Sequence, residues 1–348
     1  MIIKFFQPGK EFRLHKKEYV KNWIKVRESG NLIMKDELKV FEKNFAKFLG
    51  VKYAIGCNSG TDALFISLKA LGIQPGKKVL VPSHTFVATA QVVAQVGAIP
   101  VLYDMDLEIA IDKETVGVIV AHIAGEINVR MEGIRDKCEE LGLFLIEDAC
   151  QSLGAVQGKK KAGSFGDTGC FSFYPAKILG GPGDGGMLVT NRKDIKEFAE
   201  EYRNHWKKDY SQWGINSRLD NVIASELNLK LKRLPKVIAR RAEIAKMYLK
   251  GINDSYGLPK NRPGRVWQDF ILGVGMGTRD LLYEYLKKKG IETMKNEYPF
   301  PIEKRYQSLH YESSTLRLPI NEVITNKEVK YIIKSINEFQ NNNSPSTH

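Results

Sequence analysis

Hydrophobic residues in the first half of the chain follow two alternating spacings. Leu38, Phe41, Phe45 and Phe48 recur every three or four residues, which predicts an amphipathic helix that ends at Gly50. Short apolar runs typical of buried strands follow at 53–57, "KVLVP", "IPVLYD", "GVIVAHI" and "LFLIEDA". Between them lie the helical patterns "NSGTDALFISLKALG", "TFVATAQVVAQVG" and "RMEGIRDKCEELG". The alternation predicts an α/β fold with a mostly parallel sheet and helices on both faces.

The pattern changes after about residue 218. A long helical region follows, "RLDNVIASELNLKLKRLPKVIARRAEIAKMYLKG", which we expect to be interrupted at Pro235. "VWQDFILGVGM" is typical of a strand, and two further segments have the pattern of amphipathic helices. We therefore expect a large α/β domain over 1–235, a smaller C-terminal α+β domain over 236–340 and a disordered polar tail over 341–348.

Composition narrows the class of protein. No apolar run reaches the roughly 18 residues that a membrane span needs, and the N-terminus lacks a signal-peptide pattern. The four cysteines show no CxxC pair, so we expect reduced thiols in a cytoplasmic protein, and no His/Cys cluster has zinc-site spacing. The net charge of +13 favours polyanionic partners, but the basic residues are dispersed. The densest run, 159–161, fits a hairpin tip between glycines. We expect no nucleic acid, no membrane and no metal as partners.

One lysine stands apart from the other basic residues. Lys177 lies in "CFSFYPAKILGGPGDGGMLVT", between two apolar runs and beside a run of glycines. The G-x-G-x-x-G match over 181–186 runs into a strand instead of opening a helix, so it is not a dinucleotide fingerprint. Glycines there allow the backbone to approach a bulky group closely. Lys177 is then either a solvated loop lysine or a reactive amine beside a cofactor.

Two further positions bear on that choice. Asn58, Ser59, Gly60 and Thr61 precede a helix, where they either cap the helix or form a phosphate cradle. Asp148 ends the apolar strand "FLIED" and needs a cation or donors, which an arginine or a protonated ring nitrogen would supply. A phosphate cradle, a strand-end aspartate and a glycine-flanked lysine are together what pyridoxal 5'-phosphate (PLP) requires. The lysine forms a Schiff base with its aldehyde, and the aspartate pairs with its ring nitrogen.

Along nearly its whole length the chain resembles the PLP-dependent nucleotide-sugar aminotransferases of the DegT/DnrJ/StrS group, in the fold type I superfamily. The matching stretches are "GCNSGTDAL", "VPSHTFVATAQVV", "LIEDACQSLGA", "AGSFGDTGCFSFYPAKILGGPGDGGMLVTN" and "GINSRLDNVIASELNLKLKRL". The resemblance implies a seven-stranded sheet in the large domain, PLP as cofactor, and a homodimer whose two active sites lie at the interface.

The resemblance also implies roles for individual residues. Lys177 would be the catalytic, Schiff-base lysine and Asp148 the partner of the pyridine nitrogen. Gln151 would lie near the ring hydroxyl, and Phe86 would stack on the ring. The remaining roles are phosphate binding by Gly60, Thr61 and Ser172, and by Asn216 toward the cofactor of the neighbouring subunit.

The implied reaction moves an amino group from glutamate to a keto-deoxysugar carried by a nucleotide diphosphate, for surface polysaccharide or glycan biosynthesis. Phe86 in "HTFVAT", where family members acting at carbon 3 often have tyrosine, favours a 4-keto over a 3-keto substrate. "HIAGEINVRMEG" and "KNEYPFPIEKRY" depart from the family pattern in regions that bear on the sugar. A non-catalytic regulatory or nucleic-acid-binding protein on the same fold is the alternative from another class.

Overall fold

The computed structural model describes residues 2–104, 110–275, 277–295 and 314–343. Its centre is a seven-stranded sheet in the order β1-β9-β8-β5-β4-β2-β3, as the resemblance implied. β2, β3, β4, β5 and β8 pair in parallel, whereas β9 is antiparallel to both β8 and β1. The strands are β1 Tyr53–Cys57, β2 Lys78–Pro82, β3 Ile99–Tyr103, β4 Thr115–Ala121, β5 Phe144–Asp148, β8 Thr168–Ser172 and β9 Gly186–Thr190.

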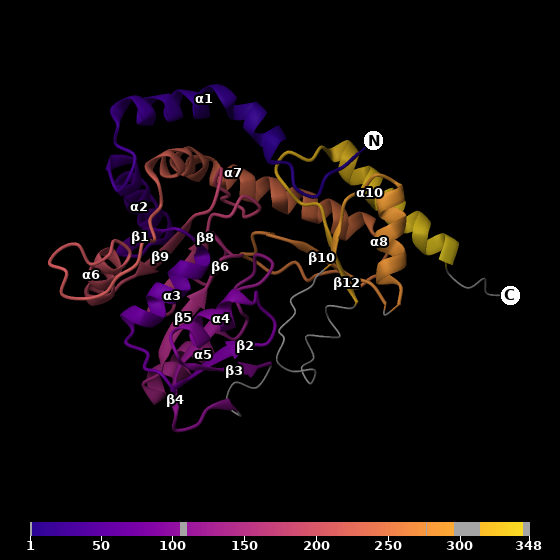
Figure 1. Cartoon of the computed structure of the whole chain (residues 1–348). Coiled ribbons are helices and arrows are strands. Elements are labelled where there is room, and N and C mark those ends of the chain that lie inside the picture. The colour runs from indigo at the N-terminus through magenta and orange to yellow at the C-terminus, as the bar shows by residue number, and fades with distance from the viewer. Residues whose placement is uncertain (1, 105–109, 276, 296–313, 344–348) are drawn as a thin grey trace.

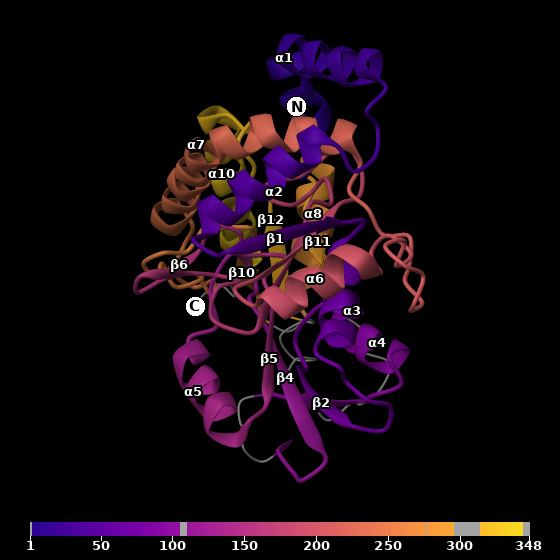
Figure 2. The same ribbon diagram turned by 90° about the vertical axis from the view of Figure 1, so that its left-hand side faces the viewer.

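Helices cover both faces of this sheet, as the alternating pattern predicted (Figure 2). One face packs against α2 (Asp36–Leu49), α5 (Met131–Leu141) and the first half of α7 (Asn221–Gly251). The other face packs against α3 (Gly60–Ala70), α4 (Ala88–Gln95) and α6 (Lys193–Tyr202). Because both faces are buried, the central strands are mostly apolar, which is why they appear as hydrophobic runs in the sequence.

A second, smaller core is built mainly from elements of the C-terminal third of the chain. Its sheet has the order β10-β12-β11, with β10 Phe270–Gly273, β11 Met294–Lys295 and β12 Thr315–Leu318. It packs against α8 (Arg279–Lys288), α10 (Asn326–Asn343) and the second half of α7. Ile3 is buried in the same core, so the extreme N-terminus packs with the C-terminal unit. The expected boundary at 235 lies within α7, which runs through both units (Figure 1).

The structure corrects the prediction of an interruption at Pro235. α7 is one continuous helix of 31 residues with Pro235 inside it. A proline removes one backbone donor, but the exposed position of Pro235 spares the packed face. Leu231 and Leu234 on that face stay buried, and their packing favours continuity.

The remaining comparisons between prediction and structure concern two helices, the hairpin of the basic run and the end of α10. α1 (Pro8–Ser29) lies along α7 in both views and has no counterpart in the predicted elements, nor has α6 (Figures 1 and 2). β6 Val156–Gln157 and β7 Lys160–Lys161 form the hairpin predicted for the basic run. α10 continues to Asn343, so residues 341–343 are helical where a tail was expected, and 344–348 lie outside the described residues.

Candidate active site

The loop that carries Lys177 folds tightly back on itself after β8. The Phe173 amide donates to the Gly185 carbonyl (2.7 Å), and the Gly181 amide donates to the Phe173 carbonyl (2.8 Å). A Cβ at Gly180 would lie 2.2 Å from the Pro175 carbonyl oxygen, so a side chain cannot be placed there. The glycine run therefore permits a compact loop, on which Lys177 is partly buried and not freely solvated.

The two carboxylates that end β5 have different surroundings. Glu147 is fully buried and accepts the amides of Gly163 (2.7 Å), Phe165 (2.6 Å) and Gly166 (2.8 Å), while its Oε2 lies 2.9 Å from His122 Nε2. These hydrogen bonds hold the loop of residues 163–166 against the end of β5, so Glu147 has a structural role.

Asp148 is 8% exposed and lies one residue further along β5. Its Oδ2 accepts the Thr89 hydroxyl (2.8 Å), and its Oδ1 accepts the Cys150 amide (3.2 Å). Within the described residues no lysine or arginine forms an ion pair with it, so the arginine alternative for this carboxylate has no support there. A buried carboxylate held by neutral donors fits a protonated ring nitrogen, which would supply the missing positive charge.

The N-terminus of α3 lies against the same strand ends. The Ser59 hydroxyl accepts the Asp62 amide (3.0 Å) and caps the helix. A Cβ at Gly60 would lie 2.7 Å from Cys150 Sγ and 2.9 Å from Ser172 Cβ, so only glycine allows this approach. Since Ser59 satisfies one amide and the first helical amides have no partner within the helix, capping and a phosphate cradle are compatible.

The remaining candidates differ in how they relate to this centre. The Gln151 side-chain oxygen accepts the Ala124 amide (3.1 Å), and the Ser172 hydroxyl accepts the Tyr174 amide (3.2 Å). Phe86, just before α4, is 56% exposed, which leaves its ring free to contact a ligand. Asn216 is exposed next to Ser217, whose hydroxyl binds the Asn58 amide (3.0 Å).

The Cys150 thiol is affected by the charges of both Asp148 and Lys177. Burial raises the pKa of its thiol well above the ordinary value, Asp148 raises it further, and the nearby Lys177 amine opposes the shift. The first residue of α3 thus packs against the Cys150 thiol, Asp148 binds the Cys150 amide, and the charge of the Lys177 amine acts on the same thiol. The structure brings together Lys177, Asp148, Gly60 and Ser172, while Asn216 and Phe86 stand at the surface.

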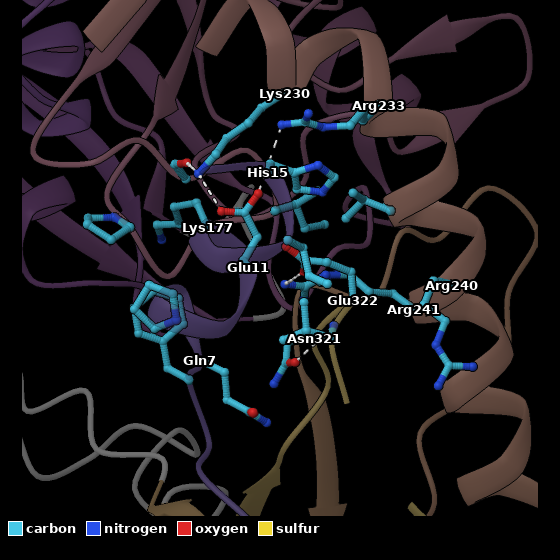
Figure 3. A pocket seen from close by; sticks show the side chains of 18 of the residues that line it. Gln7, Glu11, His15, Lys177, Lys230, Arg233, Arg240, Arg241, Asn321 and Glu322 are labelled. Atoms are coloured by element: carbon cyan, nitrogen blue, oxygen red, sulfur yellow. Dashed lines mark hydrogen bonds and ion pairs between the residues drawn. The ribbon is translucent and has the colours of Figure 1, made fainter. Parts of the chain in front are cut away.

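A cavity of about 290 Å³ opens beside the Lys177 loop, between α1, α7 and residues 321–323 (Figure 3). Figure 3 shows Lys230, Arg233, Arg240 and Arg241 of α7 around it, with Glu11 and Glu322 between them. Lys177 and Lys236 also line it, so six lysines and arginines face two carboxylates. Ion pairs with glutamates balance Lys230, Arg233, Arg240 and Arg241. The positive charge of Lys177 and Lys236 is therefore what suits an anionic ligand.

Sequence patterns did not reveal two polar residues of this region. Thr89 was part of an unremarkable helical segment, yet it donates to Asp148. Gln268 lies in the strand-like segment "VWQDFILGVGM", yet its side-chain amide contacts the backbone on both sides of Lys177. Both contacts join residues far apart in sequence, and local spacing carries no signal for them. Residues 296–313, which include the second departure from the family pattern, lie outside the described residues.

Two absences hold for the part of the chain that the structure describes. No cluster of three or more side chains there could hold a metal ion. No helix there has both the length and the apolar character needed to cross a membrane.

A fold type I α/β architecture with a lysine loop, a strand-end aspartate and a glycine-packed helix start defines a PLP-enzyme class. The family model "DegT/DnrJ/EryC1/StrS aminotransferase family" matches residues 14–337, and the chain belongs to that family. Because the family is one of aminotransferases and several relatives are named transaminases, the chain is an aminotransferase. The family is PLP-dependent.

Individual relatives are similar to this chain over most of its length. A Streptomyces venezuelae protein named dTDP-3-amino-3,4,6-trideoxy-alpha-D-glucose transaminase is 36% identical, covering 80% of this chain and 77% of the relative. A Geobacillus stearothermophilus protein named pleiotropic regulatory protein is 31% identical, covering 97% and 99%. The crystal structure of S. venezuelae DesV in complex with a ketimine intermediate has a TM-score of 0.91 at 30% identity, covering 97% and 98%.

Proposed function

We propose that this protein uses PLP to move an amino group from glutamate to a keto-deoxysugar linked to a nucleotide diphosphate. The observation that carries the proposal is the convergence of Asp148, the α3 N-terminus and the Lys177 loop around Cys150. PLP, when bound, supplies an aldehyde carbon and an electron-withdrawing ring. A cytoplasmic enzyme of surface polysaccharide or glycan biosynthesis is the setting that we infer.

Each residue of the centre has a separate task in this proposal. Lys177 would hold the cofactor through its Nζ, and the same Nζ, once released as a neutral amine, would act as the base that accepts and returns a proton. Asp148 faces the ring nitrogen, with Thr89 fixing the carboxylate. The phosphate is held by Gly60, Thr61 and Ser172, the ring hydroxyl by Gln151 and the ring face by Phe86.

The cavity beside Lys177 supports a nucleotide-linked substrate. Four of its six lysines and arginines are paired with glutamates, and the positive charge of Lys177 and Lys236 favours the negative charge of a diphosphate. Glutamate is also anionic, so the charge of the cavity suits both substrates of the reaction.

We propose further that the enzyme is a homodimer in which Asn216 of one chain reaches the cofactor phosphate of the other. The exposed position of Asn216 supports this role, because its side chain is available to a second chain. Mixing inactive Lys177→Ala and Asn216→Ala proteins, under conditions that exchange subunits, should then restore activity. Half of the dimers are mixed and each has one intact site, so roughly a quarter of wild-type activity is expected.

Steady-state assays of the mixture, with each variant alone as control, measure this effect. Asn216→Ala alone must be strongly impaired for the test to apply. Native mass spectrometry of differently tagged chains verifies that mixed dimers form. Mixed dimers without activity would contradict a site shared between chains.

The position of the keto group has two candidates, each with its own observation. Phe86 in "HTFVAT" favours carbon 4, as the family resemblance suggested. The names of several relatives, the S. venezuelae transaminase among them, place an amino or oxo group at carbon 3. Whole-protein similarity outweighs one aromatic side chain, since a tyrosine hydroxyl there would contribute only about 0.5–1.5 kcal/mol.

We therefore expect amination at carbon 3. The experiment incubates the enzyme with glutamate and matched 3-keto and 4-keto sugars linked to dTDP, UDP or GDP. NMR of the purified product locates the amine. An amine at carbon 4 would establish the other candidate and leave the chemistry at Lys177 unchanged.

A regulatory role is the second candidate from another class. The name of the G. stearothermophilus relative and the net charge of +13 favour it. A protein without PLP chemistry would show no visible absorbance band from a lysine-bound cofactor. A band that disappears on borohydride reduction would support the enzymatic proposal.

A further inference from the structure

Gln268 reaches the backbone on both sides of Lys177. Its Nε2 donates to the Ala176 carbonyl (3.1 Å), and its Oε1 accepts the Ile178 amide (3.0 Å). The orientation of the side-chain amide is unambiguous, because a carbonyl only accepts and an amide N–H only donates. We call these two hydrogen bonds the Gln268 bridge. Gln268 is 7% exposed, so water does not replace either bond easily.

The main chain of Gln268 is held as firmly as its side chain. Arg241 of α7 is buried, and its Nη1 donates to the carbonyls of Trp267 (3.2 Å) and Gln268 (3.1 Å). The Arg265 guanidinium lies 4.0 Å from the centre of the Trp267 ring. A side chain can orient a loop only if it is itself held in place. Arg241 holds the backbone on which Gln268 lies and Arg265 holds the neighbouring Trp267 ring, so the Gln268 bridge is preorganised.

The backbone is strained where the segment of Trp267 and Gln268 contacts the segment of Ala124 and Gly125. Trp267 and Ala124 have positive φ angles of 56° and 54°, which non-glycine residues rarely adopt. A Cβ at Gly125 would lie 2.5 Å from the backbone nitrogen of Gln268, so the two segments are in direct contact. Ala124 in turn donates to Gln151. One line of contacts therefore connects Gln151 with the backbone that flanks Lys177.

We infer that Gln268 is a positioning residue for Lys177. It fixes the peptide groups before and after the lysine and thereby sets the direction in which the ε-amine extends. Because Arg241 and Gln268 belong to the part of the chain that leads into the small unit, the bridge couples that unit to the reactive amine. The inference rests on the proposed role of Lys177 as the cofactor-binding lysine.

The test compares Gln268→Met and Gln268→Asn with wild type. Methionine has nearly the same length but neither donor nor acceptor, and asparagine keeps the amide but is too short to make both bonds. Gln74→Glu, on the exposed loop between α3 and β2, is the matched control for a glutamine substitution. All proteins are used at full length, both loaded with PLP and after its removal.

Hydrogen exchange of the peptide that contains Ile178 is the first readout, since it requires no bound cofactor. Without the bridge, exchange at the Ile178 amide should rise at least about tenfold in both variants and stay unchanged in the control. In the PLP-loaded variants, the pH midpoint of the visible absorbance band should shift. The value of kcat should decrease, whereas KM should change less. If methionine prevents folding, the asparagine variant decides alone.

Unchanged exchange at Ile178 together with an unchanged pH midpoint, in a folded variant, would overturn the inference. The outcome is separable from failure of the proposed function. If the cofactor proves to be attached to another lysine, peptide mapping after borohydride reduction shows it, whereas exchange at Ile178 still reports whether the bridge orders the loop.

Discussion

Replacing Lys177 by alanine should abolish amino transfer while the protein stays folded. Among Lys177, Asp148, Gly60 and Ser172, only Lys177 offers an amine that could bind the aldehyde and then carry the proton at the reacting carbon. Loss of a group that acts both as nucleophile and as proton carrier removes several orders of magnitude in rate. The measurement is turnover of glutamate with a keto sugar, alongside circular dichroism to verify the fold.

Lys177→Arg separates charge from chemistry at the same position. The guanidinium keeps the positive charge but stays protonated and forms no imine, so this variant should be as inactive as alanine. Lys159→Ala, in the turn of the β6–β7 hairpin, is the matched control and should retain full activity. Activity close to wild type in Lys177→Ala would exclude Lys177 as the reactive amine.

Asp148→Asn should retain the cofactor and slow the reaction. The substitution keeps the shape of the side chain but removes the negative charge opposite the ring nitrogen. A charge-assisted hydrogen bond contributes about 1.5–3 kcal/mol, so kcat should fall by roughly tenfold to hundredfold at least. Steady-state kinetics measure the fall, and the visible band of the bound cofactor verifies that PLP remains.

The neighbouring Glu147→Gln is the contrasting control. Its carboxylate accepts three backbone amides, so an amide group at this position would place donors against donors. We expect a lower melting temperature for this variant, with kcat per folded molecule unchanged. If Asp148→Asn behaved in the same way, Asp148 would also be structural only.

The sequence was most informative where local spacing determines structure. Alternating helix and strand patterns predicted the sheet because each element buries a face of fixed periodicity. The end of β5 and the start of α3 were visible as an apolar run followed by Asp148 and as a capping pattern around Ser59. The predicted interruption at Pro235 was wrong because the helix-breaking tendency of proline is local, whereas the packing of Leu231 and Leu234 keeps α7 continuous.

Long-range contacts determine the parts that the sequence could not show. The Gln268 bridge joins residues about 90 positions apart, and Thr89 binds Asp148 across 59 positions. Glycine requirements at Gly60 and Gly125 arise from neighbours that meet them only in the folded chain.

The most direct measurement of the central claim is the site of covalent attachment of the cofactor. The purified protein is loaded with PLP, reduced with borohydride and digested, and its peptides are analysed by mass spectrometry. We predict that the visible band disappears and that one reduced pyridoxyl group is found on Lys177, between Ala176 and Ile178. A modification on a different lysine, or none in a protein that is folded and saturated with PLP, would contradict it.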